Sequence, residues 1–237
     1  MRIFNALFER KTEVGPSVKS FYFSVPEGFT YKPGQYGIFE LESGGGALSK
    51  PFSFSSPPGT PLLEITTIMS GSDYKNALDA LEKGESIRLR GPAGSFTLEA
   101  AEGRDICFLA GGIGVTPVKS IIQAAAENGS LPDTVLIYAN RNVERIVFRD
   151  IFEELERETP GLRVVNAVSS LEGEDPGLPG FEPGRIDDSM IKRRVPGYSE
   201  RQFYSVGPPP FTRAMLDAAS RLGIESGRVT TEKFAGY

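Results

Sequence analysis

A glycine-rich segment near the middle of the chain has the residue types and spacing of a phosphate-binding loop. Gly111-Gly112-Ile113-Gly114 follows the apolar run Ile106–Ala110 and precedes Thr116-Pro117. Glycines let a backbone approach a diphosphate closely, and free amides at the start of a helix bind anions. A tight strand-to-helix turn is the alternative, but the full run favours phosphate binding. The spacing is not GxGxxG, which argues against a plain Rossmann dehydrogenase.

The chain contains no histidine and a single cysteine, Cys107. One cysteine can form no internal disulfide and cannot by itself hold an iron–sulfur cluster. The absence of histidine excludes His-liganded haem, the common histidine-bearing zinc sites and His-based triads. We therefore expect no metal site, and we expect any chemistry to come from an organic cofactor.

The composition is that of a globular protein, with 39% hydrophobic and 24% charged residues among 237. The net charge of -5 argues against nucleic acid as a partner, because binding the phosphate backbone needs a basic face. No run reaches the ~18 apolar residues of a membrane span, and the start lacks the apolar segment of a signal peptide. We therefore expect a cytoplasmic protein.

Two kinds of element pattern divide the chain near Ala100–Arg104. In residues 1–100, short apolar runs alternate with Gly and Pro, which predicts a barrel or sandwich. One helix, capped by Ser72 or Asp73, interrupts these strands. The predicted strands are Ile3–Phe8, Ser20–Val25, Tyr36–Leu41, Phe52–Ser55, Leu63–Ile68 and Ser86–Arg90.

In residues 101–237, strands alternate with helices, which predicts a parallel, doubly wound α/β sheet. Thr116 is expected to cap the first helix, with Pro117 at its first position. Gly44–Gly46 and Leu171–Gly184 are predicted loops. The strands are Ile106–Ala110, Val135–Tyr138, Val164–Val168, Phe203–Val206 and Arg228–Thr231, and the later helices are Arg149–Glu158 and Thr212–Arg221.

Five segments, in order and over most of the chain, resemble motifs of the ferredoxin–NADP reductase superfamily. The glycine-rich loop resembles its nicotinamide-nucleotide loop. The others resemble its Pro-Gly-Gln segment, its Arg-x-Tyr-Ser flavin motif, its Gly-Pro-x-Gly-x-Phe run and its late Cys-Gly-Pro motif. They are Lys32–Tyr36, Lys50–Ser56, Gly91–Phe96 and Tyr204–Pro210. The resemblance implies an antiparallel flavin-binding β-barrel (residues 1–100) followed by an NAD(P)-binding α/β domain (residues 101–237).

The resemblance implies a role in flavin binding for several residues of the first domain. Ser53 would hydrogen-bond the flavin near N5. Phe52 would stack on the ring, unless it is a core aromatic, and Lys50 would neutralise a flavin phosphate, unless it is a solvated surface lysine. The helix start would bind flavin phosphate, and FAD is favoured over FMN. The remaining expected contacts are Pro51, Ser72, Lys75, Gly91 and Gly94.

The resemblance also places the nicotinamide. Gly207 and Pro208 would lie beside it, with Val206 where many relatives have cysteine, and Glu232 would lie near it as a catalytic residue. Phe234 or Tyr237 would cover the flavin, although a frayed terminus is an alternative.

The choice of nucleotide depends on the segment after Val135–Tyr138. Arg145 stands where many NADH-using relatives have Asp, and Arg141 lies nearby, which favours NADPH over NADH. Glu144 could instead take the ribose contact. A solvated turn, with the arginines paired to Glu144 or Asp150, is a further alternative.

These features predict a flavoprotein oxidoreductase that takes hydride from NADPH or NADH and passes electrons to an unidentified acceptor, either a protein or a small molecule. One alternative is a flavin-holding or regulatory subunit of a larger complex, with little turnover of its own. A second alternative is a reductase of free flavin.

Overall fold

The computed structural model describes residues 1–43, 46–170 and 180–234. The chain divides into two compact units. Unit 1 comprises Met1–Thr97 and Thr116–Ala124, and unit 2 comprises Leu98–Val115 and the described residues from Ala125 onward. The predicted boundary between functional domains at residues 100 and 101 stays a prediction. Among the described residues, no helix has both the length and the apolar character needed to cross a membrane.

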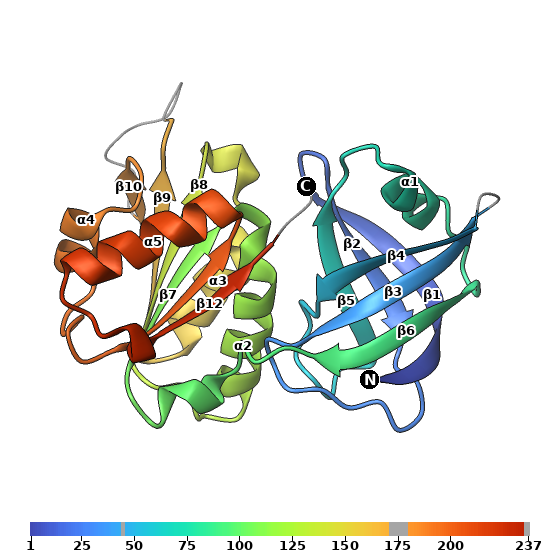
Figure 1. The fold of residues 1–237 in the computed structure, drawn as a ribbon, viewed down its shortest axis with the longest axis horizontal. Helices are drawn as coiled ribbons and strands as arrows, with labels where there is room; N and C mark the ends of the chain where they lie inside the picture. Colours follow the sequence, from blue (N-terminus) through green and yellow to red (C-terminus); the bar gives the residue numbers. More distant parts are fainter. Residues whose placement is uncertain (44–45, 171–179, 235–237) are drawn as a thin grey trace. The chain divides into compact units, whose positions relative to one another are not determined.

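Unit 1 is built on a six-stranded antiparallel sheet in the order β4-β3-β6-β1-β2-β5 (Figure 1). The predicted antiparallel N-terminal fold is confirmed. A short helix, α1 (Asp73–Asp79), follows the last strand of the order. The strands are β1 (Arg2–Gly15), β2 (Val18–Ser24), β3 (Tyr36–Ser43), β4 (Gly46–Ser53), β5 (Leu62–Ile68) and β6 (Ser86–Ala93).

Two strands of unit 1, β1 and β4, depart furthest from their predicted bounds. β1 continues to Gly15 through exposed polar residues, and β4 begins at Gly46, not at Phe52. Neither extension carries apolar alternation, because β4 lies at the sheet edge and the second half of β1 is held by hairpin pairing with β2. Backbone pairing alone gives no periodic signal in a sequence.

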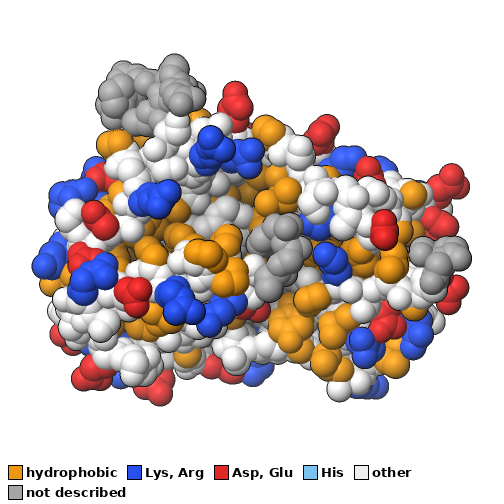
Figure 2. Space-filling view, turned by 45° about the horizontal axis from the view of Figure 1, so that its top comes forward, with side chains coloured by type: hydrophobic (Ala, Val, Ile, Leu, Met, Phe, Trp, Pro, Cys, Tyr) orange, Lys and Arg blue, Asp and Glu red, His pale blue; other side chains and the backbone are white. Residues whose placement is uncertain are grey.

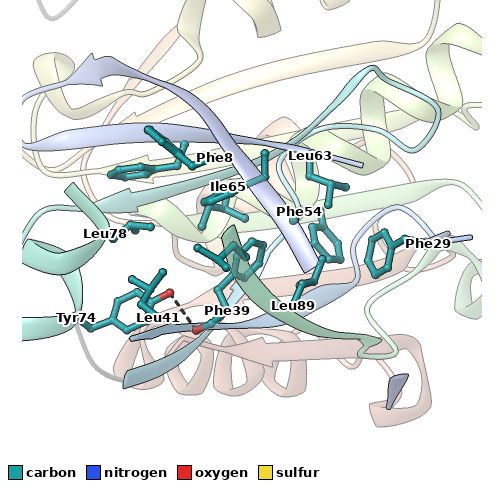
Figure 3. Close-up of a cluster of buried hydrophobic side chains, with 14 residues drawn as sticks. Phe8, Phe29, Phe39, Leu41, Phe54, Leu63, Ile65, Tyr74, Leu78 and Leu89 are labelled. Carbon is teal, nitrogen blue, oxygen red and sulfur yellow. Dashed lines mark hydrogen bonds between the residues drawn. The ribbon is translucent and has the colours of Figure 1, made fainter. Parts of the chain in front are cut away.

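Aromatic side chains fill the core of unit 1. Fourteen buried residues form the cluster, ten of which are labelled in Figure 3. Phe39 lies 5.3 Å from Phe23 and 6.2 Å from Phe54, measured between ring centroids. Tyr74 brings α1 onto this cluster, because its hydroxyl donates to the Phe39 carbonyl at 3.1 Å. The core therefore fixes the position of α1, at whose start phosphate binding is expected.

Unit 2 contains a six-stranded parallel sheet in the order β10-β9-β8-β7-β11-β12, with helices beside it (Figure 1). This confirms the predicted parallel α/β fold. Every residue of the central strand β7 is buried. The strands are β7 (Ile106–Gly111), β8 (Thr134–Asn140), β9 (Leu162–Val168), β10 (Phe181–Pro183), β11 (Gln202–Gly207) and β12 (Val229–Lys233), and the helices are α3 (Arg149–Glu158), α4 (Asp188–Arg194) and α5 (Pro209–Arg221). Helix α2 (Val115–Glu127) is divided between the units, because Thr116–Ala124 belong to unit 1.

Several elements of unit 2 correct the sequence interpretation. β10 occupies part of the predicted loop Leu171–Gly184, of which residues 171–179 lie outside the described chain, as do residues 44 and 45 of the other predicted loop. Helix α4 was not predicted, because its seven residues are too few for a clear period; Asp187 caps it by accepting from the Met190 amide at 2.8 Å. Helix α5 begins at Pro209, since prolines fit the first turn.

The expected cap of α2 is wrong. A 3₁₀ turn, Gly112–Gly114, leads directly into α2, which begins at Val115. Thr116 is therefore inside the first turn and buried, and Pro117 is the third residue of the helix. The glycine turn supplies the start of the helix, so no threonine cap is needed there.

Charged side chains are distributed over the surface without large areas of one sign on the face shown in Figure 2. Lys and Arg side chains alternate there with Asp and Glu side chains. Apolar side chains lie between them, as is usual for a globular surface.

Gly34, in the Pro-Gly-Gln segment, is expected to tolerate no side chain. Its φ is +91°, and a Cβ would lie 1.9 Å from the Phe96 carbonyl oxygen. Gly28 is the matched control, with a φ of +69° and nothing within 4 Å of its Cβ position. Gly28→Ala should lower the free energy of unfolding by about 1 kcal/mol, and Gly34→Ala by more than about 3 kcal/mol. Denaturant unfolding measures both, and equal losses would contradict the clash.

Candidate functional site

Three segments that resemble flavin motifs meet in unit 1. Ser53 pairs with Tyr36 across β4 and β3, and Tyr36 pairs with Ala93 across β3 and β6. The Gln35 side chain donates to the Gly94 carbonyl at 3.1 Å. Segments far apart in the sequence therefore lie side by side at this end of the sheet.

The two glycines of the third segment have packing roles. A Cβ on Gly91 would lie 3.3 Å from the Cα of Gly37. Gly94 has a φ of +101°, and its Cβ would lie 3.0 Å from the Tyr36 ring. Close backbone packing accounts for Gly91, and a left-handed φ beside the Tyr36 ring accounts for Gly94; contact of either glycine with flavin stays a prediction.

The residues of β4 differ in how far their side chains are buried. Pro51 is exposed, Lys50 and Phe52 are partly buried, and Ser53 is buried. The Phe52 ring packs against the core, 5.6 Å from Tyr74 between ring centroids, with an interplanar angle of 36°. Phe52 is thus at least a core aromatic, and its stacking on flavin stays a prediction.

Two lysines and an unpaired hydroxyl gather near the start of α1. Lys75 is buried and donates to the Ile68 carbonyl. Burial, and secondly the charge of Lys50, lowers the pKa of Lys75. Ser72 occupies the N-cap position, but its hydroxyl makes no capping bond, and its buried oxygen has no partner among the described residues. This donor set fits a phosphate, which would satisfy the hydroxyl and offset the repulsion between the lysines.

In unit 2, the chain after β7 and the end of β11 lie so close together that only glycine fits there. A Cβ on Gly114 would lie 2.7 Å from the Val206 carbonyl oxygen and 2.8 Å from the Cα of Gly207. A Cβ on Gly111 would lie 2.9 Å from the Phe211 ring. These glycines are required by chain packing, whatever they bind.

Gly112 differs from its neighbours in the loop. Its φ is +54°, and nothing lies within 4 Å of its Cβ position. It therefore faces open space, directly before the amides that begin α2. A backbone left bare beside helix-start amides fits the approach of a diphosphate.

Glu232 of β12 lies beside this loop. It pairs in register with Val206, and its Oε2 atom is buried without a partner among the described residues. Burial raises the pKa of Glu232 to about 7. The Phe234 amide donates to the Gly207 carbonyl at 2.9 Å. The predicted Tyr237 lies outside the described residues.

Two polar side chains near these strand ends were missed by sequence reasoning. Ser205 is fully buried in β11, and its hydroxyl has no partner among the described residues; neither has the Oδ1 atom of Asn142, which follows β8. A serine inside an apolar strand was the available signal. Unpaired buried polar atoms need a ligand or water to satisfy them.

The arginines predicted to choose the nucleotide lie between β8 and α3. Arg141 and Arg145 are both exposed, and Arg145 ends a 3₁₀ turn, Val143–Arg145. Among the described residues, neither forms an ion pair with Glu144 or Asp150. Their predicted contact with the nucleotide stays a prediction.

A separate cavity of about 300 Å³ lies between α3 and β9, with Arg149, Phe152, Asn166 and Phe181 in its wall. None of the residues predicted for nucleotide binding lines it. The strand-end region around Gly112 and Glu232 is therefore the candidate nucleotide site.

A comparison with known families gives a match within the second half of the chain. Residues 108–217 match the family described as "Oxidoreductase NAD-binding domain". The match begins in β7 and ends in α5, so it includes the glycine-rich loop and Gly207.

Comparison with whole proteins gives similar relatives. The chain is 31% identical over 231 residues to the reductase subunit of a stachydrine N-demethylase from Rhizobium meliloti, covering 94% of this chain and 64% of that protein, which is less than two thirds of its length.

Two solved structures share the fold. One is a cytochrome P450 reductase from Amycolatopsis (TM-score 0.84, 22% identity, 98% of this chain and 70% of that chain). The other is a ferredoxin NADP+ reductase from Neisseria gonorrhoeae with bound FAD and NADP (TM-score 0.83, 18% identity, 98% and 99%).

Glu232→Gln should change how stability depends on pH. Because burial raises the pKa of Glu232 from 4.5 to about 7, the folded chain binds more protons than the unfolded chain between these values. This carboxyl therefore lowers the free energy of unfolding as the pH rises through that window. At 1.36 kcal/mol per pKa unit, the loss is at most about 3 kcal/mol.

We expect the stability of Glu232→Gln relative to the parent chain to increase between about pH 4.5 and 7 and to stay level above it. Denaturant unfolding of the nucleotide-free protein across this range measures the difference. Glu200→Gln, at an exposed carboxyl, is the control. A difference for Glu232→Gln that does not vary with pH would contradict the raised pKa.

Proposed function

We propose that the chain belongs to the ferredoxin–NADP reductase superfamily and that it is a flavoprotein oxidoreductase that oxidises NAD(P)H and passes the electrons to an acceptor; the matched NAD-binding family, the similar reductase subunit and the shared fold support this. One observation carries the proposal most directly. At the ends of β7, β11 and β12, the glycine-only packing of Gly114 and Gly207 lies beside Glu232, whose buried Oε2 atom has no partner among the described residues. Ligands of open α/β sheets bind at such strand ends.

The flavin would be held by unit 1. The donor set of Lys50, Lys75 and Ser72 would bind phosphate, and Ser53 would donate near N5. When bound, the flavin supplies a group that accepts hydride and releases electrons singly or in pairs. The residues of the chain bind and orient it. FAD is favoured over FMN, in line with the bound FAD named for the Neisseria reductase.

The nucleotide would be held by unit 2. Amides that follow Gly112 would bind the diphosphate, with Thr116 and Pro117 shaping the first turn of α2 behind them. Gly207 and Pro208 would leave room for the nicotinamide, and Phe234 would lie beyond it. Glu232, with a pKa near 7, can donate or accept a hydrogen bond at neutral pH. Its role is orientation of the nicotinamide, because hydride transfer needs positioning more than proton transfer.

The acceptor is proposed to be a protein. The Rhizobium relative is a reductase subunit of a demethylase, and the Amycolatopsis structure is a cytochrome P450 reductase. The chain spans only 64% of the Rhizobium protein. The name of the Rhizobium relative, a reductase subunit, favours a second candidate, a subunit that holds flavin within a larger redox complex, over a reductase of free flavin.

Anaerobic reduction tests the proposed function. The purified chain, reconstituted with FAD and freed of unbound flavin by gel filtration, should lose its yellow colour on addition of NADPH or NADH. Flavin that does not stay with the protein would favour a reductase of free flavin. Bound flavin that neither nucleotide reduces would favour a subunit without turnover.

Gly112→Val should abolish nucleotide binding while flavin stays bound, because a branched side chain would occupy the open space before α2. Gly129→Val is the matched control, since Gly129 also has a left-handed φ, +61° against +54°, and also has nothing near its Cβ position. Both variants carry backbone strain of about 1–3 kcal/mol, so equal losses of stability are expected. Isothermal titration with NADP+ and NAD+ should show loss of affinity only for Gly112→Val, and equal affinities would contradict the site.

Arg145→Asp should move the nucleotide preference from NADPH towards NADH, because a carboxylate repels the 2′-phosphate that an arginine attracts. We expect a change in the ratio of kcat/KM values on the order of 10-fold, or about 1.4 kcal/mol. Arg157→Asp, an exposed charge reversal on α3, is the control. A parent chain that prefers NADH, or a preference that Arg145→Asp leaves in place, would refute this role.

A further inference from the structure

The part of helix α2 that belongs to unit 1 carries two buried polar side chains. Lys119 lies 2.7 Å from Oε2 of Glu64 on β5, and its Nζ also donates to the Ser55 carbonyl at 3.0 Å. The Ser120 hydroxyl donates to the Ser56 carbonyl at 2.6 Å. Lys119, Ser120 and Glu64 are all buried. The helix that begins at the glycine-rich loop is thus bound to the end of the flavin motif.

The second oxygen of Glu64 is also paired. Its Oε1 atom accepts from the Ser20 hydroxyl at 2.7 Å and from the Tyr22 hydroxyl at 3.2 Å. A buried ion pair is costly to desolvate, and it is maintained only with good geometry and satisfied hydrogen bonds. Glu64 meets these conditions with Lys119, so the position of Lys119 is narrowly defined.

Further hydrogen bonds fix the backbone at Ser55 and Ser56. The Ser55 amide donates to the Glu64 carbonyl at 2.8 Å, and the Glu64 amide donates to the Ser56 hydroxyl at 3.0 Å. The Tyr31 hydroxyl donates to the Ser56 carbonyl at 2.9 Å. Ser53, the expected donor to the flavin, lies two residues before Ser55.

We propose that Lys119 and Ser120 are positioning residues for reduction of the flavin. Through the carbonyls of Ser55 and Ser56, which belong to the same unit, they set the place of Ser53. The inference rests on the proposed function. A displacement of about 1 Å at a reacting group can lower a rate by on the order of 100-fold, so loosening this segment should slow hydride transfer.

Stability alone would not require this arrangement. Replacing both members of a buried ion pair with apolar residues of similar volume is often neutral or stabilising, whereas removing one member is strongly destabilising. A purely structural pair could therefore be exchanged for methionine and leucine with a loss of stability only, which comes from the hydrogen bonds that Ser20, Tyr22 and the Ser55 carbonyl lose. Positioning predicts that the same exchange also slows the reaction in a chain that remains folded.

The test uses the full chain loaded with FAD. One variant is Lys119→Met/Glu64→Leu, and a milder one is Ser120→Ala. The control is Lys19→Met/Asp79→Leu, which removes the partly exposed ion pairs of Asp79 with Lys19 (2.8 Å) and Lys11 (3.1 Å) in the same unit. Stopped-flow reduction under anaerobic conditions gives the rate at saturating NADPH or NADH and the half-saturating concentration. The flavin absorption spectrum and the melting temperature are recorded for each chain.

We expect the saturated rate to fall roughly 10-fold or more in both test variants. The half-saturating concentration should stay within about twofold, a change of about 0.4 kcal/mol, and the flavin absorption maxima should shift. The control should match the parent chain in every measurement except melting temperature. Test variants that are reduced as fast as the control would overturn the inference.

Other outcomes are also decisive. If the double variant does not fold, Ser120→Ala alone decides, because it removes a single hydrogen bond. If the half-saturating concentration rises while the saturated rate is unchanged, the helix serves nucleotide binding and the inference is wrong. A parent chain that binds no FAD would instead refute the proposed function, so the two failures are distinguishable.

Discussion

The approach of the Gly112–Gly114 turn to the end of β11 is the constraint on which the candidate nucleotide site depends. Gly114 and Gly207 meet at distances that exclude any side chain, so the polypeptide itself forms the floor of the site. The parallel sheet then places β12 next to β11, and Glu232 next to Val206. Larger residues at these positions would separate the strand ends and remove the surface on which a diphosphate can lie against backbone amides.

Each unit leaves polar atoms unsatisfied where a ligand is expected. Ser72 in unit 1, and Ser205 and Glu232 in unit 2, have buried oxygens without partners among the described residues. Such atoms lower the stability of a folded chain unless something binds them. The buried carboxylate of Glu64, in contrast, has partners at both of its oxygens.

Sequence reasoning found the elements that have strong local patterns. β7 reads as a continuous apolar run because both of its faces are buried. It missed α4 and the start of β4, where short length or an exposed edge leaves no apolar period. The cap of α2 was misassigned because Thr116-Pro117 fits a common helix start, whereas the glycine turn before it determines the true start.

The sequence by itself determined the two-part fold and the location of the glycine-rich loop, because local composition and spacing carry these. The order of the segments that resemble flavin motifs came from the resemblance to a known superfamily. Only the tertiary structure decided what surrounds each residue. It made Phe52 part of an aromatic core, buried the carboxyl of Glu232 and raised its pKa, and paired Lys119 with Glu64. Burial and pairing depend on segments far apart in the chain, which come together only when the sheets form; local pattern therefore cannot specify them.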